Sequence, residues 1–502
     1  MRVVHYDCWC INYSLTFMAK KRLALSVKLF WGVGQIGEGV KTAAFNSFLL
    51  FYYNQILGVS ATLTSLALAI AILFDAITDP IAGSASDRFQ SRWGRRHPFM
   101  AASAPLLGLT LFFLFAPPGE MTEMFYFGWL LFFAIAVRTC LTLYHVPHLA
   151  LGAEMETDYN ARSALFSIGL LFGAIAAYLF YFSSLTFIFY PRDGLANGLY
   201  YGDGYPYMSA LAGLTSTVAI ILCVWGTRSV IPQLSKAVPT EEKLGIGRIY
   251  RELRVAFSSP SYRSIFFGLM LGTIVVSVEA VLLAFMGVHF WELETDQLRL
   301  VPLGVIFGLP IGAVIGSNLV KVLDKKWCLI IPAILATLNN NVLIILRLLE
   351  ILPENGHPII VPLLIGQAFL AAVLMPVIFI TINSMFADIS DELELSTGRR
   401  QEGIIYSARS FASKAANALG TIVGGMALDF IAFPKNAEPG SVAPEVIFNL
   451  GLVQGPLTSI FSLSGLVLYL GYRLTRTRHQ EIVQALEERQ FLERKVGEGK
   501  VG

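Results

Sequence analysis

The sequence predicts an all-α membrane protein with twelve transmembrane helices arranged as two six-helix pseudo-repeats. Three observations lead to this fold class: few charged residues, a series of long apolar windows, and matching motifs in the two halves of the chain. The 502 residues are 55% hydrophobic and only 14% charged, whereas soluble proteins carry about 25% charged residues. Because so few charges could not cover the surface of soluble domains, we expect the chain to lie in a lipid bilayer.

The composition also excludes several function classes. A formal net charge of +2 offers no basic surface of the kind that binds nucleic acid, so we expect no nucleic-acid partner. The five cysteines are an odd number and lie mostly in apolar runs. A disulfide framework is therefore not expected.

A helix needs about 20 mostly apolar residues to cross a bilayer. Twelve windows of the chain meet this requirement. Pro147, Pro310 and Pro376 inside them are tolerated where neighbouring helices satisfy the freed backbone groups. The windows lie near residues 29–54, 62–86, 98–117, 125–152, 164–190, 207–230, 264–291, 301–323, 327–350, 358–386, 404–432 and 449–474.

The distribution of lysine and arginine predicts the orientation of these helices. Of the 37 basic residues, four fall in loops that follow odd-numbered windows and five fall inside windows. The remaining 28 fall at the two ends of the chain and in loops that follow even-numbered windows. Because basic residues are retained on the cytoplasmic side, both termini are expected in the cytoplasm.

The windows and the basic segments divide the chain into five parts. These are a cytoplasmic N-terminal segment (1–23), an N-terminal six-helix bundle (24–230), a cytoplasmic linker (231–262), a C-terminal six-helix bundle (263–474) and a cytoplasmic tail (475–502). Met18 and the basic residues after it resemble a start, so residues 1–17 are expected to be a dispensable leader. The tail mixes charged and apolar residues at helical spacing, which predicts a surface helix.

Two pairs of motifs indicate an internal duplication. Gly83-Ser84 matches Gly316-Ser317 at an offset of 233 residues (316 − 83). Ala153-Glu154 at the end of the fourth window matches Ala387-Asp388 at the end of the tenth, at an offset of 234 (387 − 153). Repeated halves that rock about a central site are the usual arrangement of secondary transporters.

Asp75 and Asp79 are unusual residues of the second window because they place two carboxylates in apolar sequence. They are four residues apart and therefore lie on one face of a helix. Two such carboxylates repel one another unless a cation or a basic side chain lies between them. The pair is either a structural ion pair with another helix or a site for Na⁺ or H⁺, since hard oxygen ligands suit a hard cation.

These aspartates are part of a longer pattern. Its segments are Lys28-Leu-Phe-Trp-Gly-Val-Gly34, Asp75-Ala-Ile-Thr-Asp79-Pro80-Ile-Ala-Gly83, Ser86-Asp87-Arg88, Ser91-Arg92-Trp93-Gly94-Arg95-Arg96-His97-Pro98-Phe99, Thr142-Leu-Tyr-His-Val-Pro147 and Arg400-Gln-Glu-Gly-Ile-Ile-Tyr406-Ser407. The pattern resembles the glycoside–pentoside–hexuronide:cation symporters of the major facilitator superfamily over residues 24–474. The resemblance implies the major facilitator fold, transport by alternating access and a place in a bacterial inner membrane.

The resemblance also implies a cation site. In the family, the residues that match Asp75, Asp79 and Thr142 bind a monovalent cation, either Na⁺ or H⁺. A lysine that matches Lys414 lies close to them, so Lys414 is expected to couple the cation to the solute. Thr78 stands where some family members have an asparagine, so the coordination is expected to differ in detail.

The loop after the second window resembles the gating loop of the superfamily. Its gating residues would be Asp87, Arg88, Arg95 and Arg96, whose charges bridge helix ends and separate when the halves rock. Basic residues at this position also set the topology. Neither role makes them solute ligands.

The expected solute site departs from the family pattern. Two positions at which family members carry acidic residues that bind sugar hydroxyls are occupied here by Gly39 and His145. The first window instead carries Glu38 and Lys41. In the fourth window, Arg138 lies on the same helical face as His145.

Two interpretations of these charged residues stay open. Glu38, Glu279, Arg138 and Arg409 can pair into an internal ion-pair network. Alternatively, Glu38, Lys41, Arg138 and His145 line a cavity and bind the solute. In the second case the local positive charge favours an anionic solute such as a hexuronide.

The predicted function is cation-coupled symport of a small polar solute, either a glycoside or a hexuronide. A carrier of lysophospholipids or other anionic amphiphiles is the main alternative, because the animal lysophospholipid carriers resemble the same family. A non-transporting sensor of the same fold is a further alternative. We expect a monomer whose partners are the bilayer, the solute and a monovalent cation.

Motifs of nucleotide binding and hydrolysis give no support to an enzyme. A G-x-G-x-x-G pattern occurs at Gly32, Gly34 and Gly37, but it lies inside the first window with no strand before it, which indicates close helix packing. The sequence holds no P-loop, H-E-x-x-H or G-x-S-x-G motif. We therefore expect no catalytic residues, no cofactor and no metal other than Na⁺.

Overall fold

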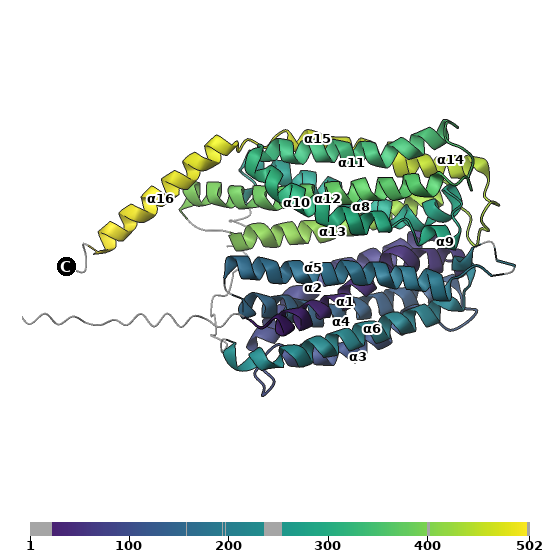
Figure 1. Ribbon diagram of the computed structural model, residues 1–502, viewed down its shortest axis with the longest axis horizontal. Helices are drawn as coiled ribbons and strands as arrows, with labels where there is room; N and C mark the ends of the chain where they lie inside the picture. Colours follow the sequence, from purple (N-terminus) through teal and green to yellow (C-terminus); the bar gives the residue numbers. More distant parts are fainter. Residues whose placement is uncertain are drawn as a thin grey trace, which may run out of the picture.

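The computed structural model describes residues 23–156, 158–192, 194–195, 197–234, 254–398 and 402–498. Nearly all of these residues are helical, and no strand occurs among them (Figure 1). The expected leader and most of the expected linker lie outside the described residues.

The first half of the chain, residues 23–234, forms six long helices. They are α1 (Leu25–Ala44) with the π-helical turns η1 (Phe45–Leu49) and η2 (Tyr52–Ile56), α2 (Ala61–Arg88), α3 (His97–Leu114), α4 (Glu123–Met155), α5 (Tyr159–Ser183) with η3 (Ser184–Ile188), and α6 (Gly204–Thr227). The short 3-10 turns η4 (Gly198–Tyr200) and η5 (Arg228–Gln233) flank α6.

The second half, residues 254–474, repeats this pattern, and a tail helix follows it. Its helices are α8 (Pro260–Phe285) with η6 (Met286–Phe290), α9 (Thr295–Leu298), α10 (Leu303–Val322), α11 (Lys325–Leu348), α12 (Ile360–Thr397), α13 (Glu402–Phe430), and α14 (Pro444–Leu452) with η7 (Val453–Leu457) and α15 (Thr458–Tyr469). The tail forms α16 (Arg476–Glu498).

The all-helical membrane fold expected from the sequence is confirmed. Among the described residues, ten helices are long and apolar enough to cross a membrane. Helices α1 and α13 are not among them, since both carry charged side chains such as Lys41 and Lys414 within their apolar sequence. Both nevertheless pack against spanning helices, α1 against α5 and α6, and α13 against α2 and α8.

Helix α12 differs most from its expected window. It continues to Thr397, eleven residues past the expected end at 386 (397 − 386). The extension carries Asp388, Asp391 and Glu392, because the helix leaves the apolar region without ending. Hydropathy marks where a helix leaves the bilayer and not where its backbone hydrogen bonds stop.

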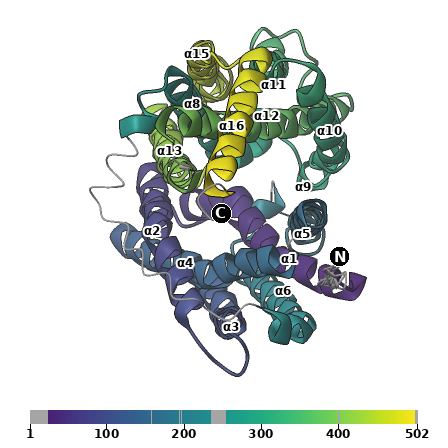
Figure 2. The ribbon, with the colours of Figure 1, turned by 90° about the vertical axis from the view of Figure 1, so that its left-hand side faces the viewer.

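The two halves pack their helices in matching ways. In the first half α1 packs on α5 and α6, and α4 packs on α2 and α3. In the second half α8 packs on α13 and α15, and α12 packs on α10 and α11. Figures 1 and 2 show the two halves as separate bundles lying side by side. The division into two six-helix units remains our proposal, and this matched packing supports it.

The two ends of the molecule differ in how they join the halves. We call the end with the start of α1, the α2–α3 loop and α16 the basic end, and the opposite end the far end (Figure 2 looks onto the basic end). From the positive-inside rule we expect the basic end to lie in the cytoplasm.

At the far end, hydrogen bonds cross between the halves. Asp429 at the end of α13 accepts from the backbone N–H of Thr62 at 2.9 Å and from the hydroxyl of Ser60 at 2.8 Å. Lys435 binds Glu123 at 2.8 Å. Further contacts of the same kind are Gln55 with Pro434 and Ala437, Asn197 with Leu293, Gly198 with Thr295, and Tyr200 with Ala437. We call these contacts the far-end seal.

The basic end has no such seal among the residues that the structure describes. There, the hydrogen bonds and ion pairs between described side chains stay within one half, as for Lys28 with Glu156 and Lys325 with Asp388. The molecule is therefore closed at the far end, which corresponds to an inward-facing conformation if the basic end is cytoplasmic.

Candidate cation and solute site

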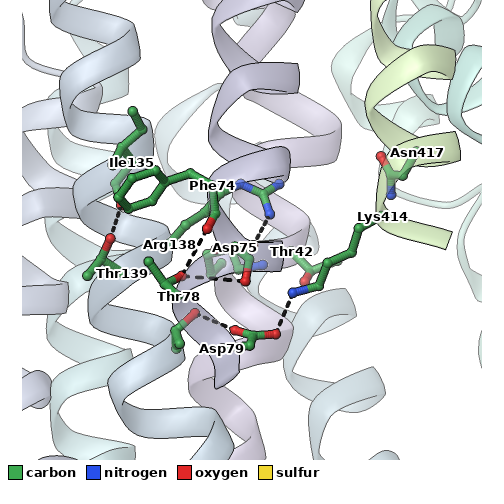
Figure 3. Close-up of polar contacts among 12 residues, drawn as sticks. Thr42, Phe74, Asp75, Thr78, Asp79, Ile135, Arg138, Thr139, Lys414 and Asn417 are labelled. Atoms are coloured by element: carbon green, nitrogen blue, oxygen red, sulfur yellow. Dashed lines mark hydrogen bonds and ion pairs between the residues drawn. The ribbon is translucent and has the colours of Figure 1, made fainter. Parts of the chain in front are cut away.

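Helix α2 carries the two aspartates between two neighbouring helices, α4 of its own half and α13 of the other half (Figure 3). Arg138 of α4 donates from Nη1 to Asp75 Oδ2 at 2.6 Å. Thr142, one turn further along α4, donates its hydroxyl to Asp79 Oδ1 at 2.8 Å. Lys414 of α13 donates to Asp79 Oδ2. Each aspartate thus has its own basic partner.

The two ion pairs differ in exposure. The side chains of Asp75 and Arg138 are 15% and 16% exposed, whereas those of Asp79 and Lys414 are 35% and 24% exposed. Breaking a buried ion pair costs more than breaking an accessible one. The Asp79–Lys414 pair is therefore the easier one for an incoming cation to open.

The oxygen atoms around α2 fit a hard monovalent cation. Asp75 Oδ1 is buried and has no hydrogen-bond partner among the described residues. The carboxylate of Asp79 and the hydroxyl of Thr142 supply further oxygen ligands. The described residues hold no cluster of three or more His, Cys, Asp or Glu side chains suited to a metal. Carboxylate and hydroxyl oxygens are hard ligands of the kind that a hard cation prefers.

Thr78 does not turn its hydroxyl to either carboxylate. It donates to the backbone carbonyl of Phe74 at 3.2 Å, within its own helix. The residue that departs from the family pattern is thus satisfied locally, as serine and threonine often are in helices.

The solute-side candidates lie next to this site. On α1, Lys41 and Thr42 both donate to Glu38 Oε1, at 3.2 and 3.1 Å, because they follow it by three and four residues. The Lys41 ammonium and the Arg138 guanidinium each lie 5.7 Å from the ring centre of Phe45. The first π-helical turn therefore brings the charged groups of α1 and α4 to one ring.

His145 connects the solute candidates with the cation candidates. Its imidazole lies within electrostatic reach of Glu38 and Lys41 and also of Asp79 and Lys414. The four solute-side candidates and the cation candidates thus form one continuous polar region between α1, α2, α4 and α13.

The alternative ion-pair network suggested by the sequence does not form. Glu38 pairs with Lys41, and Arg138 pairs with Asp75. Arg409 donates to Asn383 at 2.5 Å, and Glu279 accepts from Asn340 at 2.9 Å. Glu38 takes a partner on its own helix, whereas Arg138, Arg409 and Glu279 take partners on adjacent helices that sequence spacing alone could not identify.

The gating candidates form a cluster at the basic end, with one exception. Arg95 and Arg96 both donate to Glu154 Oε1, and Arg96 also contacts Asp87 at 3.3 Å. Burial and the neighbouring charge of Arg95 lower the pKa of Arg96. Arg88 is exposed and forms no hydrogen bond or ion pair with a described residue.

The partner of these arginines, Glu154, was not among the gating residues expected from the sequence. The second half holds its counterpart, because Lys325 at the start of α11 binds Asp388 of α12 at 2.6 Å. Tyr472 adds a hydrogen bond to Asp388 at 3.2 Å. Glu154 and Asp388 are the acidic residues of the repeated Ala-acid motif, so the repeat carried the signal that identifies them.

Known proteins resemble this chain in sequence and in fold. The sequence model of one family, described as MFS/sugar transport protein, matches residues 30–476. The chain belongs to this family. The resemblance to the glycoside–pentoside–hexuronide:cation symporters is thereby confirmed, and the protein is an integral multi-pass membrane transporter rather than an enzyme.

Individual relatives agree with this assignment. An uncharacterised symporter of Synechocystis is 24% identical over 554 residues, which cover 94% of this chain and 98% of that protein. The glucuronide carrier protein homolog of Escherichia coli is 21% identical over 473 residues, with 93% and 96% coverage. The solved D-xylose–proton symporter shares the fold, with a TM-score of 0.60 at 17% identity over 89% of this chain and 96% of that chain. This symporter family couples solute movement to a cation.

Proposed function

We propose that the protein couples Na⁺ or H⁺ entry to uptake of a glycoside or hexuronide, with an anionic hexuronide favoured. The observation that carries the proposal is a balance of charge in the candidate site. Three cationic side chains pair there with three anionic ones, and these pairs are Lys41–Glu38, Arg138–Asp75 and Lys414–Asp79.

This balance gives a physical reason for coupling. A cation that binds at Asp79 adds one positive charge to a region that is otherwise neutral. Because net charge inside a membrane protein is costly, the carboxylate of an anionic solute would restore neutrality. Each ligand then strengthens the binding of the other, as symport requires.

The cation step follows from the exposure of the Asp79–Lys414 pair. Asp79 and Thr142, with the unpartnered Asp75 Oδ1, would hold the cation once Lys414 moves away. Lys414 belongs to the second half, so its release changes the contact between the halves. Cation binding and rocking of the halves would therefore be linked through one side chain.

The solute step falls to the residues around Phe45. Lys41 is buried, and with Arg138 it presents two cationic groups to the same ring. His145 would donate a hydrogen bond to a sugar hydroxyl or accept one from it, and the Glu38 carboxylate would accept hydrogen bonds from sugar hydroxyls. A relative named as a glucuronide carrier homolog supports a solute with a carboxylate.

Transport by purified protein in liposomes tests this function. Under an inward Na⁺ or H⁺ gradient, we expect accumulation of a glucuronide above its equilibrium level and weaker accumulation of the matching neutral glycoside. Preference for the neutral glycoside would contradict the charge argument. Uptake blocked by lysophosphatidylcholine but not by sugars would favour the lipid carrier, and no movement of any solute under either gradient would favour the sensor.

One variant makes the test specific to the site. Lys41→Gln removes one positive charge, so we expect the KM for the glucuronide to rise more than the KM for the neutral glycoside. Lys321→Gln, at an exposed lysine of the basic end, is the matched control and should leave both values unchanged. Equal effects on the two solutes would contradict the role of Lys41.

A further inference from the structure

Helix α8 carries a carboxylate that belongs neither to the cation site nor to the gating clusters. Glu279 lies nineteen residues past the start of α8 at Pro260 (279 − 260). Its Oε1 accepts a hydrogen bond from Asn340 Nδ2 of α11 at 2.9 Å. No basic side chain among the described residues forms an ion pair with it. Carboxylates in apolar spans usually pair with a basic side chain, so one without a basic partner is a candidate functional group.

The position of Glu279 on α8 places it inside the second half. It follows Gly268 by eleven residues and Gly272 by seven, so it shares their helical face. Gly268 packs closely against Tyr469 of α15. The opposite face, with Ser277, packs instead on Gly420 of α13. Glu279 therefore points toward α11 and α15, away from the α2–α13 contact that holds Asp79.

The hydrogen-bond partner of Glu279 belongs to a cluster of neutral amides and hydroxyls. Asn340 also donates to the backbone carbonyl of Gln454 at 3.2 Å. The next residue, Asn341, donates to Thr337 at 2.7 Å and to Ser459. Gln454 is 7% exposed, and its Oε1 is buried with no partner among the described residues. The cluster thus holds a buried acceptor that lacks a donor.

The charged and titratable groups on the elements around α8 have other partners or lie elsewhere. On α13, Arg409, Lys414 and Asp429 bind Asn383, Asp79 and the start of α2. On α11, Lys325, Lys326 and Arg347 bind Asp388, Leu470 and Pro353. On α12, Asp388, Asp391, Glu392 and Glu394 lie in the extension at the basic end. His289 of η6 binds Tyr200, Tyr469 of α15 packs on Gly268, and η1 and η7 carry no charged residue.

Glu279 is only partly exposed, so an ionised carboxylate there would place one uncompensated negative charge beside apolar helices. Such a charge is expensive, and one hydrogen bond from a neutral amide does not offset it. A protonated carboxyl removes the charge. It also supplies an O–H donor to a cluster that has an unsatisfied acceptor.

We propose that Glu279 and Asn340 form a proton-binding site inside the second half, separate from the cation site at Asp75 and Asp79. The site carries a proton in the conformation seen here, with the far end sealed. Its ligand is a proton whatever the solute or coupling ion proves to be. Failure of the proposed solute specificity would leave this site untouched.

Infrared spectroscopy of the purified full-length protein tests the site directly. The C=O stretch of a protonated carboxyl is separate from the bands of an ionised carboxylate. At neutral pH we expect native protein to show a protonated-carboxyl band that Glu279→Gln lacks, and we expect the band to disappear as the pH is raised. Glu354→Gln, at an exposed carboxylate in the loop between α11 and α12, is the control and should leave this band in place.

A chemical probe gives a second readout that needs no variant. The hydrophobic reagent dicyclohexylcarbodiimide reacts with a protonated carboxyl, whose O–H adds across one C=N bond, and the product rearranges to an N-acylurea without a leaving group. Mass spectrometry should find this adduct on Glu279 at neutral pH, with a lower yield at alkaline pH. An unchanged infrared band in Glu279→Gln would overturn the proposal. If that variant cannot be purified, absence of the adduct from native protein would overturn it.

Discussion

Lys414 of α13 donates a hydrogen bond to Asp79 of α2, across the contact between the two halves. The hydroxyl of Thr142 occupies the other carboxylate oxygen at 2.8 Å. Away from the far end, this ion pair is the direct polar link between described residues of the two halves. Anything that binds Asp79 therefore also acts on the contact through which the halves move.

If Lys414 competes with the cation for Asp79, removing it should tighten cation binding. We expect Lys414→Gln to lower the half-saturating Na⁺ concentration, measured by thermal stabilisation of purified protein, by about tenfold, which corresponds to about 1.4 kcal/mol. Lys326→Gln, at the basic end, should leave this concentration unchanged. An unchanged or higher Na⁺ requirement in Lys414→Gln would show that the lysine does not compete.

The Asp75–Arg138 pair should behave as a buried ion pair. Arg138→Gln leaves Asp75 without its partner, so we expect the free energy of unfolding to fall by about 3–5 kcal/mol. The double variant Asp75→Asn with Arg138→Gln should recover most of this loss, because it leaves no uncompensated charge. Denaturant unfolding in detergent measures both values. Additive losses in the double variant would contradict a direct pair.

The far-end seal should hold the molecule closed on that side through Asp429. We expect Asp429→Ala to remove the hydrogen bonds to the start of α2, which cap a helix and together contribute about 1–2 kcal/mol. That amount changes a two-state equilibrium roughly 5–30-fold. A cysteine introduced at the buried Ser65 should then react faster with an impermeant thiol reagent added at the far end.

A matched control separates this effect from a general change of surface charge. Glu354 is exposed in the loop between α11 and α12, and its side chain forms no hydrogen bond or ion pair with a described residue. Glu354→Ala should leave the labelling rate of the Ser65 cysteine unchanged. Equal labelling rates in Asp429→Ala and in the native background would mean that the seal does not set the conformation.

The tail helix α16 should depend on His479 for its position. His479 Nε2 lies 3.0 Å from Asp391 and 3.3 Å from Asp388 of α12. We expect His479→Ala to speed limited proteolysis within α16 while the helix bundle keeps its unfolding midpoint. Arg478→Ala, at an exposed residue that pairs only with Glu481 among the described residues, is the control. Equal cleavage rates in both variants would contradict docking through His479.

Hydropathy predicted the helices well. In lipid, every backbone N–H and C=O of a span must be hydrogen-bonded within the protein, so a long apolar window folds as a helix. It also drew attention to Asp75, Asp79 and Arg138, since charged residues in apolar sequence are rare. It could not place the end of α12, because the acidic extension is helical but not apolar.

The partners of the charged residues were harder to predict. Lys414 lies 335 residues from Asp79, and only the family resemblance connected them. Asp429 looks like an ordinary residue at a helix end, and its role depends on where the start of α2 lies. Such pairings follow from how distant helices pack, which spacing within one helix does not reveal. The repeated Ala-acid motif, which indicated the duplication, also held a signal for the role of Glu154 at the basic end.

Gradient-driven accumulation by Asp79→Asn in liposomes tests the central claim, that Asp79 binds the coupling cation. Asparagine keeps the size of the side chain and removes the charge that attracts the cation. We predict that the variant equilibrates the solute down its own gradient but does not accumulate it under either a Na⁺ or an H⁺ gradient. Accumulation equal to that of the native protein under either gradient would contradict the assignment.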